Sequence, residues 1–279
     1  MKPAPRVTVV VIVRDGERFL GEALESIAAQ HYSDWETVVV DDGSRDGSRA
    51  VAEAFASRMP GRFRVAMHEA GANLGMSASR NLGISLARGE FVTFLDHDDA
   101  MLPEKLARQV ALLDAHAEVS AVIGPNLRWN SWLPGAPGDE PQDLGIVGAS
   151  VVDPPGLLPF FLARTSATPQ APMVRRDAIR AVGGFDDSFR GMYEDQVFLA
   201  KLFLGHRVLV VDEVWQKYRQ HDDSCVRRAH RERSHLRDRA RFLRWLAARP
   251  GLPRGVAELV ARERRRAFWA RLRLALRVR

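Results

Sequence analysis

Short apolar runs alternate with amphipathic segments through the first 125 residues, and this alternation limits the chain to few folds. The first run, Val7–Val13, is apolar except for one threonine and rich in β-branched residues, as expected of a strand buried on both faces. Further strands are predicted at 36–40, 63–68, 91–95 and 119–123, and helices at 17–30, 46–57, 77–87 and 103–115. These units predict a Rossmann-like α/β fold, with a mostly parallel sheet flanked by helices.

The remainder of the chain is less regular. Gly89 is predicted to end the helix over 77–87. Prolines and glycines break up the stretch from Leu127 to Pro159, and a loop of this length is expected to be functional or disordered. A helix is predicted over 194–204. Beyond Val226 the chain is predicted to form a basic helical extension, divided into two helices at Pro250, Gly251 and Pro253.

The charge of the chain is unevenly distributed. Residues 226–279 contain 18 arginines and 4 acidic residues, which gives this segment a net charge of +14. Because the net charge of the whole chain is +6, the remaining residues carry a net charge of −8. An acidic body with a basic tail indicates either an anionic partner for the tail or docking of the tail on the body. It does not make the whole chain a nucleic-acid binder, and no nucleic-acid partner is expected.

The expected location is the cytoplasm. The only cysteine, Cys225, cannot form an internal disulfide, which favours a reducing compartment. Residues 1–6 do not read as a signal peptide, and no segment reaches about 18 consecutive apolar residues, so no transmembrane helix is predicted.

Two acidic clusters follow predicted strands, namely Asp41-Asp42-Gly43-Ser44 and Asp96-His97-Asp98-Asp99. Ligands of open α/β sheets bind beyond the carboxyl ends of the strands, where crowded carboxylates need a cation or hydrogen-bond donors. Asp96 and Asp98 can share a divalent ion such as Mn²⁺ or Mg²⁺, which would neutralise a departing diphosphate. The alternative is a solvated turn in which Asp98 or Asp99 caps the following helix.

Other polar residues are candidates for the same site. The carboxylate of Asp42 could accept a hydrogen bond from a pyrimidine base, or simply belong to a turn. Arg80 could reach a phosphate, or be an ordinary surface arginine. His221 could complete the metal site or contact the diphosphate, although a lone histidine is more often structural.

Glu194 and Asp195 begin the helix predicted over 194–204. Acidic residues are favoured there by the helix dipole alone. Their functional interpretation is a general base that removes the proton of a hydroxyl acceptor, because placing two carboxylates side by side raises the pKa of one of them.

Taken together, several motifs resemble those of the family 2 glycosyltransferases, which have the GT-A fold. They are Val9-Val-Val-Ile-Val-Arg-Asp-Gly16, Val39-Val-Asp-Asp-Gly-Ser44, Asn73-Leu-Gly75, Ser79-Arg-Asn81, Phe94-Leu-Asp-His-Asp-Asp99, Val182-Gly-Gly-Phe-Asp186 and Glu194-Asp195. The resemblance covers about residues 7–221. It implies a GT-A domain over 1–225, with a nucleotide-binding half over about 1–125 and an acceptor-side half over 126–225, followed by the tail at 226–279.

The resemblance also implies roles for individual residues. Asp42 corresponds to the base-reading aspartate. Asp96 and Asp98 correspond to the metal and diphosphate motif, with Asp99 adjacent. Asp195 corresponds to the catalytic base, with Glu194 as the second choice. One departure is Ile12-Val-Arg-Asp15, where many members have Pro-x-Tyr-Asn; this puts the base and ribose contacts of that loop in doubt, and Arg14 is its donor-binding candidate.

The expected function is therefore transfer of a sugar from a nucleotide-diphospho-sugar, with a UDP-sugar favoured, to the hydroxyl of a glycan or lipid-linked acceptor. The resemblance implies a metal-dependent, inverting single displacement with an aspartate base. Alternatives are a sugar-nucleotide pyrophosphorylase, whose Gly-rich phosphate loop is here reduced to Arg14 and Gly16, and an inert scaffold on the same fold.

Two interpretations of the tail remain open. Phe268, Trp269, Leu272 and Leu276 form an apolar stripe among arginines that could lie on an anionic membrane, at its inner face. Alternatively, the tail packs on the catalytic body with its arginines solvated. Trp129 and Trp132 are expected on the acceptor side.

Overall fold

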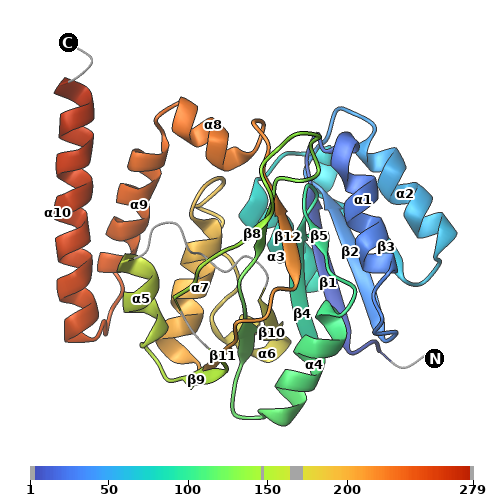
Figure 1. Cartoon of the computed structure of the whole chain (residues 1–279), viewed down its shortest axis with the longest axis horizontal. Coiled ribbons are helices and arrows are strands. Elements are labelled where there is room, and N and C mark those ends of the chain that lie inside the picture. The colour runs from blue at the N-terminus through green and yellow to red at the C-terminus, as the bar shows by residue number, and fades with distance from the viewer. Residues whose placement is uncertain (1–3, 146–147, 164–171, 277–279) are drawn as a thin grey trace.

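The computed structural model describes residues 4–145, 148–163 and 172–276, arranged around a central sheet (Figure 1). In this part of the chain the sheet has eight strands in the order β3-β2-β1-β4-β10-β6-β11-β9. Their bounds are β1 Val7–Val13, β2 Trp35–Asp41, β3 Phe63–Met67, β4 Phe91–Asp96, β6 Ala121–Ile123, β9 Ser150–Val152, β10 Met173–Arg175 and β11 Val208–Val210. Strands β1 to β4 are mutually parallel, whereas β10 and β9 run antiparallel to their neighbours. The predicted α/β fold with a mostly parallel sheet is confirmed.

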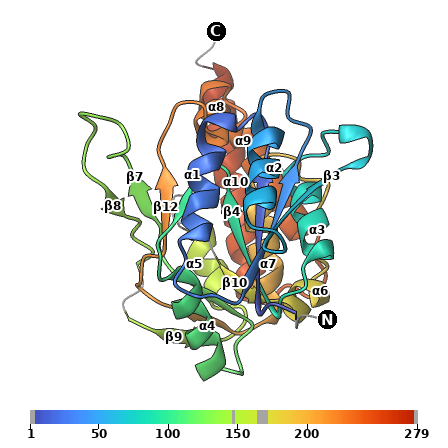
Figure 2. The same cartoon turned by 90° about the vertical axis from the view of Figure 1, so that its right-hand side faces the viewer.

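Helices cover both faces of this sheet (Figures 1 and 2). Helices α1, α2 and α4 pack on one face, and α3, α5, α6, α7, α9 and α10 on the other. The bounds are α1 Glu17–Ala28, α2 Ser48–Arg58, α3 Met76–Leu86, α4 Lys105–Ala115, α5 Leu157–Ala163, α6 Arg176–Ala181, α7 Glu194–Gly205, α8 Cys225–Arg231, α9 His235–Ala247 and α10 Arg254–Leu276.

Strand β1 shows why the sheet is buried on both sides. Successive side chains of a strand point to opposite faces. Val9 and Val11 accordingly lie in the core under α1 and α4, and Val10 and Ile12 lie in the core on the opposite face. An unbroken apolar run is the sequence that this position requires.

A second, smaller sheet lies beside the carboxyl end of β4. Its strand order is β5-β12-β7-β8, with β5 Ala100–Met101, β7 Leu127–Trp129, β8 Glu140–Pro141 and β12 Gln216–Arg219. The stretch Leu127–Pro159 is therefore not one long loop, because it contains β7, β8, β9 and the start of α5. Periodicity does not reveal these short strands, since they pair with segments distant in sequence, such as β12 and β11.

Gly89 does not end a helix, contrary to the prediction. Helix α3 ends at Leu86, and Ala87 is already extended. Gly89 instead lies against β1: its N–H donates to Thr8 Oγ1, and a Cβ at this position would lie 2.6 Å from the Thr8 nitrogen. The glycine is explained by this close approach of two backbones.

The tail differs from the prediction in having a third helix, α8, before the two expected ones. Phe242, Leu243 and Leu246 of α9 and Val256 and Val260 of α10 belong to the core on the α7 side of the sheet. The tail is thus packed on the body through one of its faces. None of the described helices is long and apolar enough to cross a bilayer.

The contact at Gly89 predicts a specific loss of stability. Replacing Gly89 with alanine forces β1 and the 87–90 segment apart, so we expect the free energy of unfolding to fall by about 1–3 kcal/mol. The control is Gly21→Ala in α1, where an added Cβ meets nothing within 4 Å and a gain of up to about 1 kcal/mol is expected. Urea denaturation measures both, and equal stabilities of the two variants would contradict the close approach.

Candidate active site

The two acidic clusters meet at one edge of the sheet because β1 pairs with both strands that precede them. Val13, the last residue of β1, lies opposite Asp41 of β2, and Ile12 lies opposite Asp96 of β4. The carboxyl ends of parallel strands lie at the same edge, where ligands of such sheets bind. The register of the sheet therefore places both acidic clusters at the same edge, as expected from the sequence.

Arg80 connects the acidic residues of this edge. Its Nη2 donates to Asp96 Oδ1 at 2.7 Å, and its Nη1 donates to Glu194 Oε1 at 2.6 Å. The side chains of Arg80 and Glu194 are each 7% exposed, so this is a buried ion pair. Burial alone would lower the pKa of Arg80, but the carboxylates of Asp96 and Glu194 raise it above its ordinary value. Arg80 is therefore a buried bridge, and not the surface arginine that the sequence left open.

Helix α7 brings Glu194 and Asp195 to Arg80. The residue before them, Tyr193, has a left-handed backbone with φ of 75°, which costs a non-glycine residue energy and marks a tightly determined turn. Burial first, and the neighbouring Asp195 second, raise the pKa of Glu194 to about 7. Burial also raises the pKa of Asp195.

These two carboxylates have different surroundings. Glu194 is buried and accepts from Arg80, whereas Asp195 is partly exposed and accepts a hydrogen bond from the Gln196 N–H of its own helix. Of the two residues, Asp195 is the more exposed.

Asp98 is paired with His221. His221 Nε2 lies 2.9 Å from Asp98 Oδ2, and both side chains are largely buried. Burial would raise the pKa of Asp98, but the hydrogen bond with His221 and the nearby His97 lower it. The structure thus brings together two of the predicted metal residues that are 123 positions apart in sequence.

Asp99 is directed toward β12 of the second sheet. It is 1% exposed and accepts hydrogen bonds from the Arg219 N–H and the Gln216 side chain, both in β12. Burial, and next the carboxylates of Asp98 and Asp96, raise its pKa well above the ordinary value. Asp99 therefore fastens the acidic loop to the second sheet.

Arg219 was not identified from the sequence, although it stands in the Tyr218-Arg-Gln-His221 segment. It is 3% exposed, its Nε donates to the Asp98 carbonyl, and its Nη2 pairs with Glu22. Its guanidinium lies 4.0 Å from the ring centre of Trp129 and also stacks near Phe19 and Trp132. A buried arginine among aromatic rings is a rigid support for the Asp98 loop. The two tryptophans expected at the acceptor side are part of that support.

The predicted metal ligands fit a divalent ion only in part. Over the described ranges, no group of three or more His, Cys, Asp or Glu side chains is arranged to hold a metal. Asp99 is hydrogen-bonded to β12. Asp96 and Asp98 lie at the carboxyl edge of the sheet with His221, whose buried Nδ1 has no hydrogen-bond partner. Mg²⁺ commonly uses one or two carboxylates and takes its other ligands from substrate phosphates and water, so this smaller set is compatible with an ion that arrives with a diphosphate.

The carboxylate of Asp42 is hydrogen-bonded to the turn that precedes α3. Its carboxylate accepts from the Asn73 side chain at 2.7 Å and from the N–H groups of Leu74 and Gly75. Asp42 thereby fixes the start of the helix that carries Arg80, a role that its sequence position did not reveal. Arg14, by contrast, is about half exposed, and its Nε lies 3.7 Å from Asp15 Oδ2.

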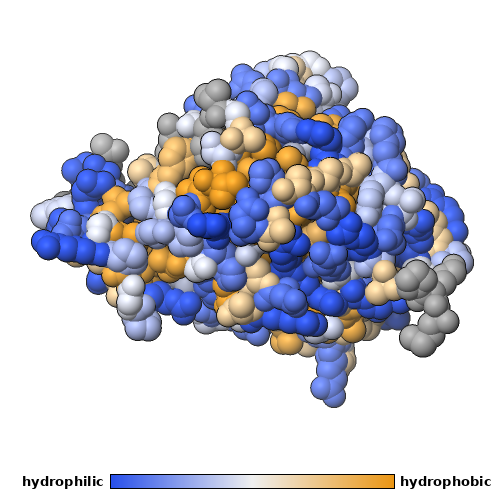
Figure 3. All heavy atoms as spheres, turned by 90° about the horizontal axis from the view of Figure 1, so that it is seen from below, coloured by the Kyte–Doolittle hydropathy of each residue, from blue (hydrophilic) through white to orange (hydrophobic). Residues whose placement is uncertain are grey.

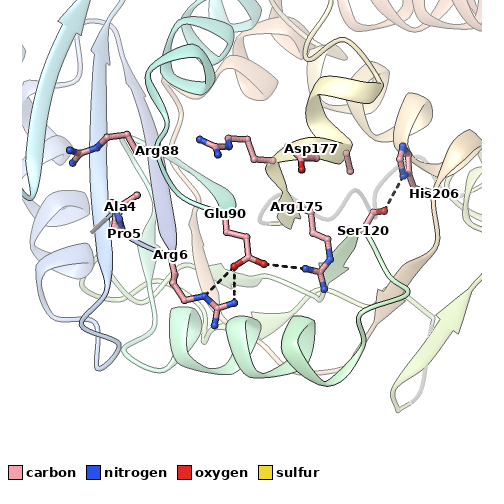
Figure 4. Close-up of a pocket in the computed structure, with 11 residues that line it drawn as sticks. Ala4, Pro5, Arg6, Arg88, Glu90, Ser120, Arg175, Asp177 and His206 are labelled. Carbon is pink, nitrogen blue, oxygen red and sulfur yellow. Dashed lines mark hydrogen bonds and ion pairs between the residues drawn. The ribbon is translucent and has the colours of Figure 1, made fainter. Parts of the chain in front are cut away.

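A separate cavity of about 600 Å³ opens at the opposite edge of the sheet, at the amino ends of β1, β4 and β6 (Figure 4). Arg6 and Arg175 both pair with Glu90 there, and Ser120 contacts His206. Figure 3 shows this lower face as mostly hydrophilic with smaller hydrophobic areas. Because these arginines are already paired with Glu90, we interpret the charged residues that line the cavity as a structural ion-pair network.

Comparisons with known proteins relate the chain to a family. Residues 8–135 match the family described as "Glycosyl transferase family 2". Residues 8–135 thus resemble the family 2 glycosyltransferases. Over 234 residues this glycosyltransferase is 28% identical to the putative glycosyltransferase EpsE of Bacillus subtilis, covering 82% of this chain and 78% of EpsE. It is 41% identical over 100 residues to the putative glycosyltransferase EpsH of the same bacterium, which is 36% of this chain and 28% of EpsH.

Solved structures agree on the fold of this glycosyltransferase. The structure of S. aureus TarS in complex with UDP-GlcNAc matches with a TM-score of 0.73 at 22% identity, covering 95% of this chain and 73% of that chain. The mannosyltransferase PcManGT from Pyrobaculum calidifontis, in complex with GDP-Man and Mn²⁺, matches with a TM-score of 0.64 at 20% identity, covering 94% and 70%. The GT-A fold is thus confirmed by the solved structures, and the sequence comparisons identify the chain as a glycosyltransferase.

The raised pKa of Glu194 predicts how stability depends on pH. The folded state holds the proton of Glu194 up to about pH 7, whereas the unfolded chain releases it near pH 4.5, so the contribution of Glu194 to the free energy of unfolding falls as pH rises between these values. Glu194→Gln keeps an acceptor for Arg80 but removes this titration. We therefore expect the variant to gain stability relative to the native protein between pH 4.5 and pH 7, measured by urea denaturation. A difference that is constant with pH would contradict the shift.

Proposed function

We propose that this glycosyltransferase transfers a sugar from a UDP-sugar to the hydroxyl of a glycan or lipid-linked acceptor, with inversion at the anomeric carbon. The observation that carries the proposal is the bridge of Arg80 between Asp96 and Glu194. Through it, the acidic motif after β4 and the start of α7 share one site, so donor and acceptor chemistry can meet there. The choice of UDP draws support from the related TarS structure, which contains UDP-GlcNAc.

Asp195 is proposed as the general base. It is the more open of the two carboxylates at the start of α7, and its raised pKa makes it a better proton acceptor. It would remove the proton of the acceptor hydroxyl as that oxygen attacks the anomeric carbon from the side opposite the leaving diphosphate. Glu194 would act through Arg80, holding the guanidinium in place.

The donor side is assigned to the other residues of the edge. Asp96 and Asp98, with His221, would hold a Mn²⁺ or Mg²⁺ ion, which when bound offsets the negative charge of the diphosphate. Arg80 and the exposed Arg14 would orient the donor. Asp42 contributes by fixing the turn at 73–75, because its carboxylate is already engaged there.

Replacing Asp195 with asparagine tests the base. We expect the rate of transfer to fall by a factor of about 10²–10⁴, because the side chain keeps its shape and loses its ability to accept a proton. Binding of UDP, measured by thermal shift, should change little. The matched control is Asp177→Asn, an exposed aspartate on α6 at the opposite edge of the sheet, which should keep full activity. Near-normal turnover of Asp195→Asn would show that another group is the base.

A panel of nucleoside diphosphates, with and without Mn²⁺, tests the donor site. Binding to the folded state raises the unfolding free energy by about 2.7 kcal/mol at 100 times Kd, which raises the melting temperature by several degrees. We expect the largest shift with UDP and Mn²⁺ together, and its loss in Asp98→Ala but not in Asp153→Ala, whose side chain is exposed beside Arg207. No shift with any nucleotide would favour the inert scaffold.

A further inference from the structure

The inner face of helix α10 is buried against the body of the protein. Val256, Val260, Glu263 and Ala267 are buried, and their spacing places them along one stripe of the helix. The helix packs on α9 and α5 through this stripe. Glu263, its only buried acid, accepts from Arg239 of α9 at 2.8 Å and from Arg266. The inner stripe therefore fixes the orientation of α10 on the body.

The opposite face of α10 carries large apolar side chains in solvent. Phe268 is 61% exposed, Trp269 54% and Leu272 38%. At about 100° per residue these three lie within one sector of the helix, roughly opposite the buried stripe. Leu276 would continue this sector, but its side chain lies outside the part that the structure describes. Because the inner face is packed on the body, the apolar sector must point into solvent. Such an exposed apolar sector is unusual in a solvated helix.

Arginines border this apolar sector on both sides. The same helical geometry places Arg264 and Arg271 along one border and Arg266 and Arg273 along the other, and all four are exposed. The nearest acid, Glu263, faces inward and is already paired with Arg239. Over residues 268–273 the outer face is therefore apolar in the middle and strongly positive at its edges, and the exposed Arg265 lies in line with the middle of this face, earlier in the helix.

We propose that the outer face of α10, defined by Phe268, Trp269 and Leu272 and their bordering arginines, docks on an anionic lipid bilayer. Phenylalanine, tryptophan and leucine insert at the boundary between head groups and acyl chains, and arginines beside them attract anionic head groups. A nucleic acid would use the arginines and leave the apolar sector in water, so the charge and apolar patterns together favour the bilayer.

The position of α10 gives this docking a consequence. The helix forms one side of the molecule, and its carboxyl end lies at the same end as α8, in both views (Figures 1 and 2). Helix α8 begins at Cys225, four residues after His221, which lies 2.9 Å from Asp98, so this is the end that carries the candidate active site. Docking through the end of α10 would bring the site near the membrane. If the proposed function is correct, the acceptor is then a lipid-linked one.

Co-sedimentation of the full chain with vesicles tests the docking. We expect binding to vesicles of phosphatidylcholine with phosphatidylglycerol, and at least about tenfold weaker binding to phosphatidylcholine alone or at high salt. The triple variant F268S/W269S/L272S should lose this binding. The matched control is L133S/V151S, which removes exposed apolar side chains of similar accessibility elsewhere on the surface. Melting temperature and UDP binding, unchanged in both variants, show that the fold is intact.

Three outcomes would overturn the proposal. They are equal binding of the triple variant and the native chain, equal binding to neutral and anionic vesicles, and binding of duplex DNA in place of vesicles. Asp195→Asn should bind vesicles as the native chain does, so a failure of the docking and a failure of the catalytic assignment are observed separately.

Discussion

The candidate site depends on the buried ion pair between Arg80 and Glu194. Above the raised pKa of Glu194, about 7, this pair consists of two charges in a largely dry environment, and removal of one partner costs about 3–5 kcal/mol. Because Arg80 also binds Asp96, the same guanidinium ties α3, β4 and α7 together. The end of β4 and the start of α7 are thus both positioned against one arginine.

A second set of buried polar contacts holds the acidic loop from the other side. Asp99 is fastened to β12 through Gln216 and the Arg219 backbone, and Arg219 in turn holds the Asp98 carbonyl. Lys105 at the start of α4 lies near this group, and its burial lowers its pKa to about 7. The short β5-β12-β7-β8 sheet therefore makes the acidic loop rigid while Asp98 and His221 stay together.

The tail continues the body and also presents a separate surface. Its inner side chains complete the core on the α7 face, and Tyr193, which precedes the proposed base, stacks on Phe242 of α9. The outer side of α10 has no comparable partner among the described residues, and it is the part to which we assign contact with lipid. The two interpretations that the sequence kept apart, packing and membrane contact, thus apply to opposite faces of one helix.

Local pattern was enough to predict the α/β class, the order of the first elements and the two acidic clusters, because strand and helix periodicity and the position of a residue after a strand are local properties of the sequence. The sequence also pointed to Glu194 and Asp195 as a pair. Only the tertiary structure separated them, by burying Glu194 against Arg80 and leaving Asp195 more open. Contacts between residues some 30 to 120 positions apart likewise decided three further features. Arg219 binds the Asp98 carbonyl, Asp99 is hydrogen-bonded to β12, and Asp42 is hydrogen-bonded to the turn before α3. Such contacts depend on how the elements pack, and no local pattern encodes that packing.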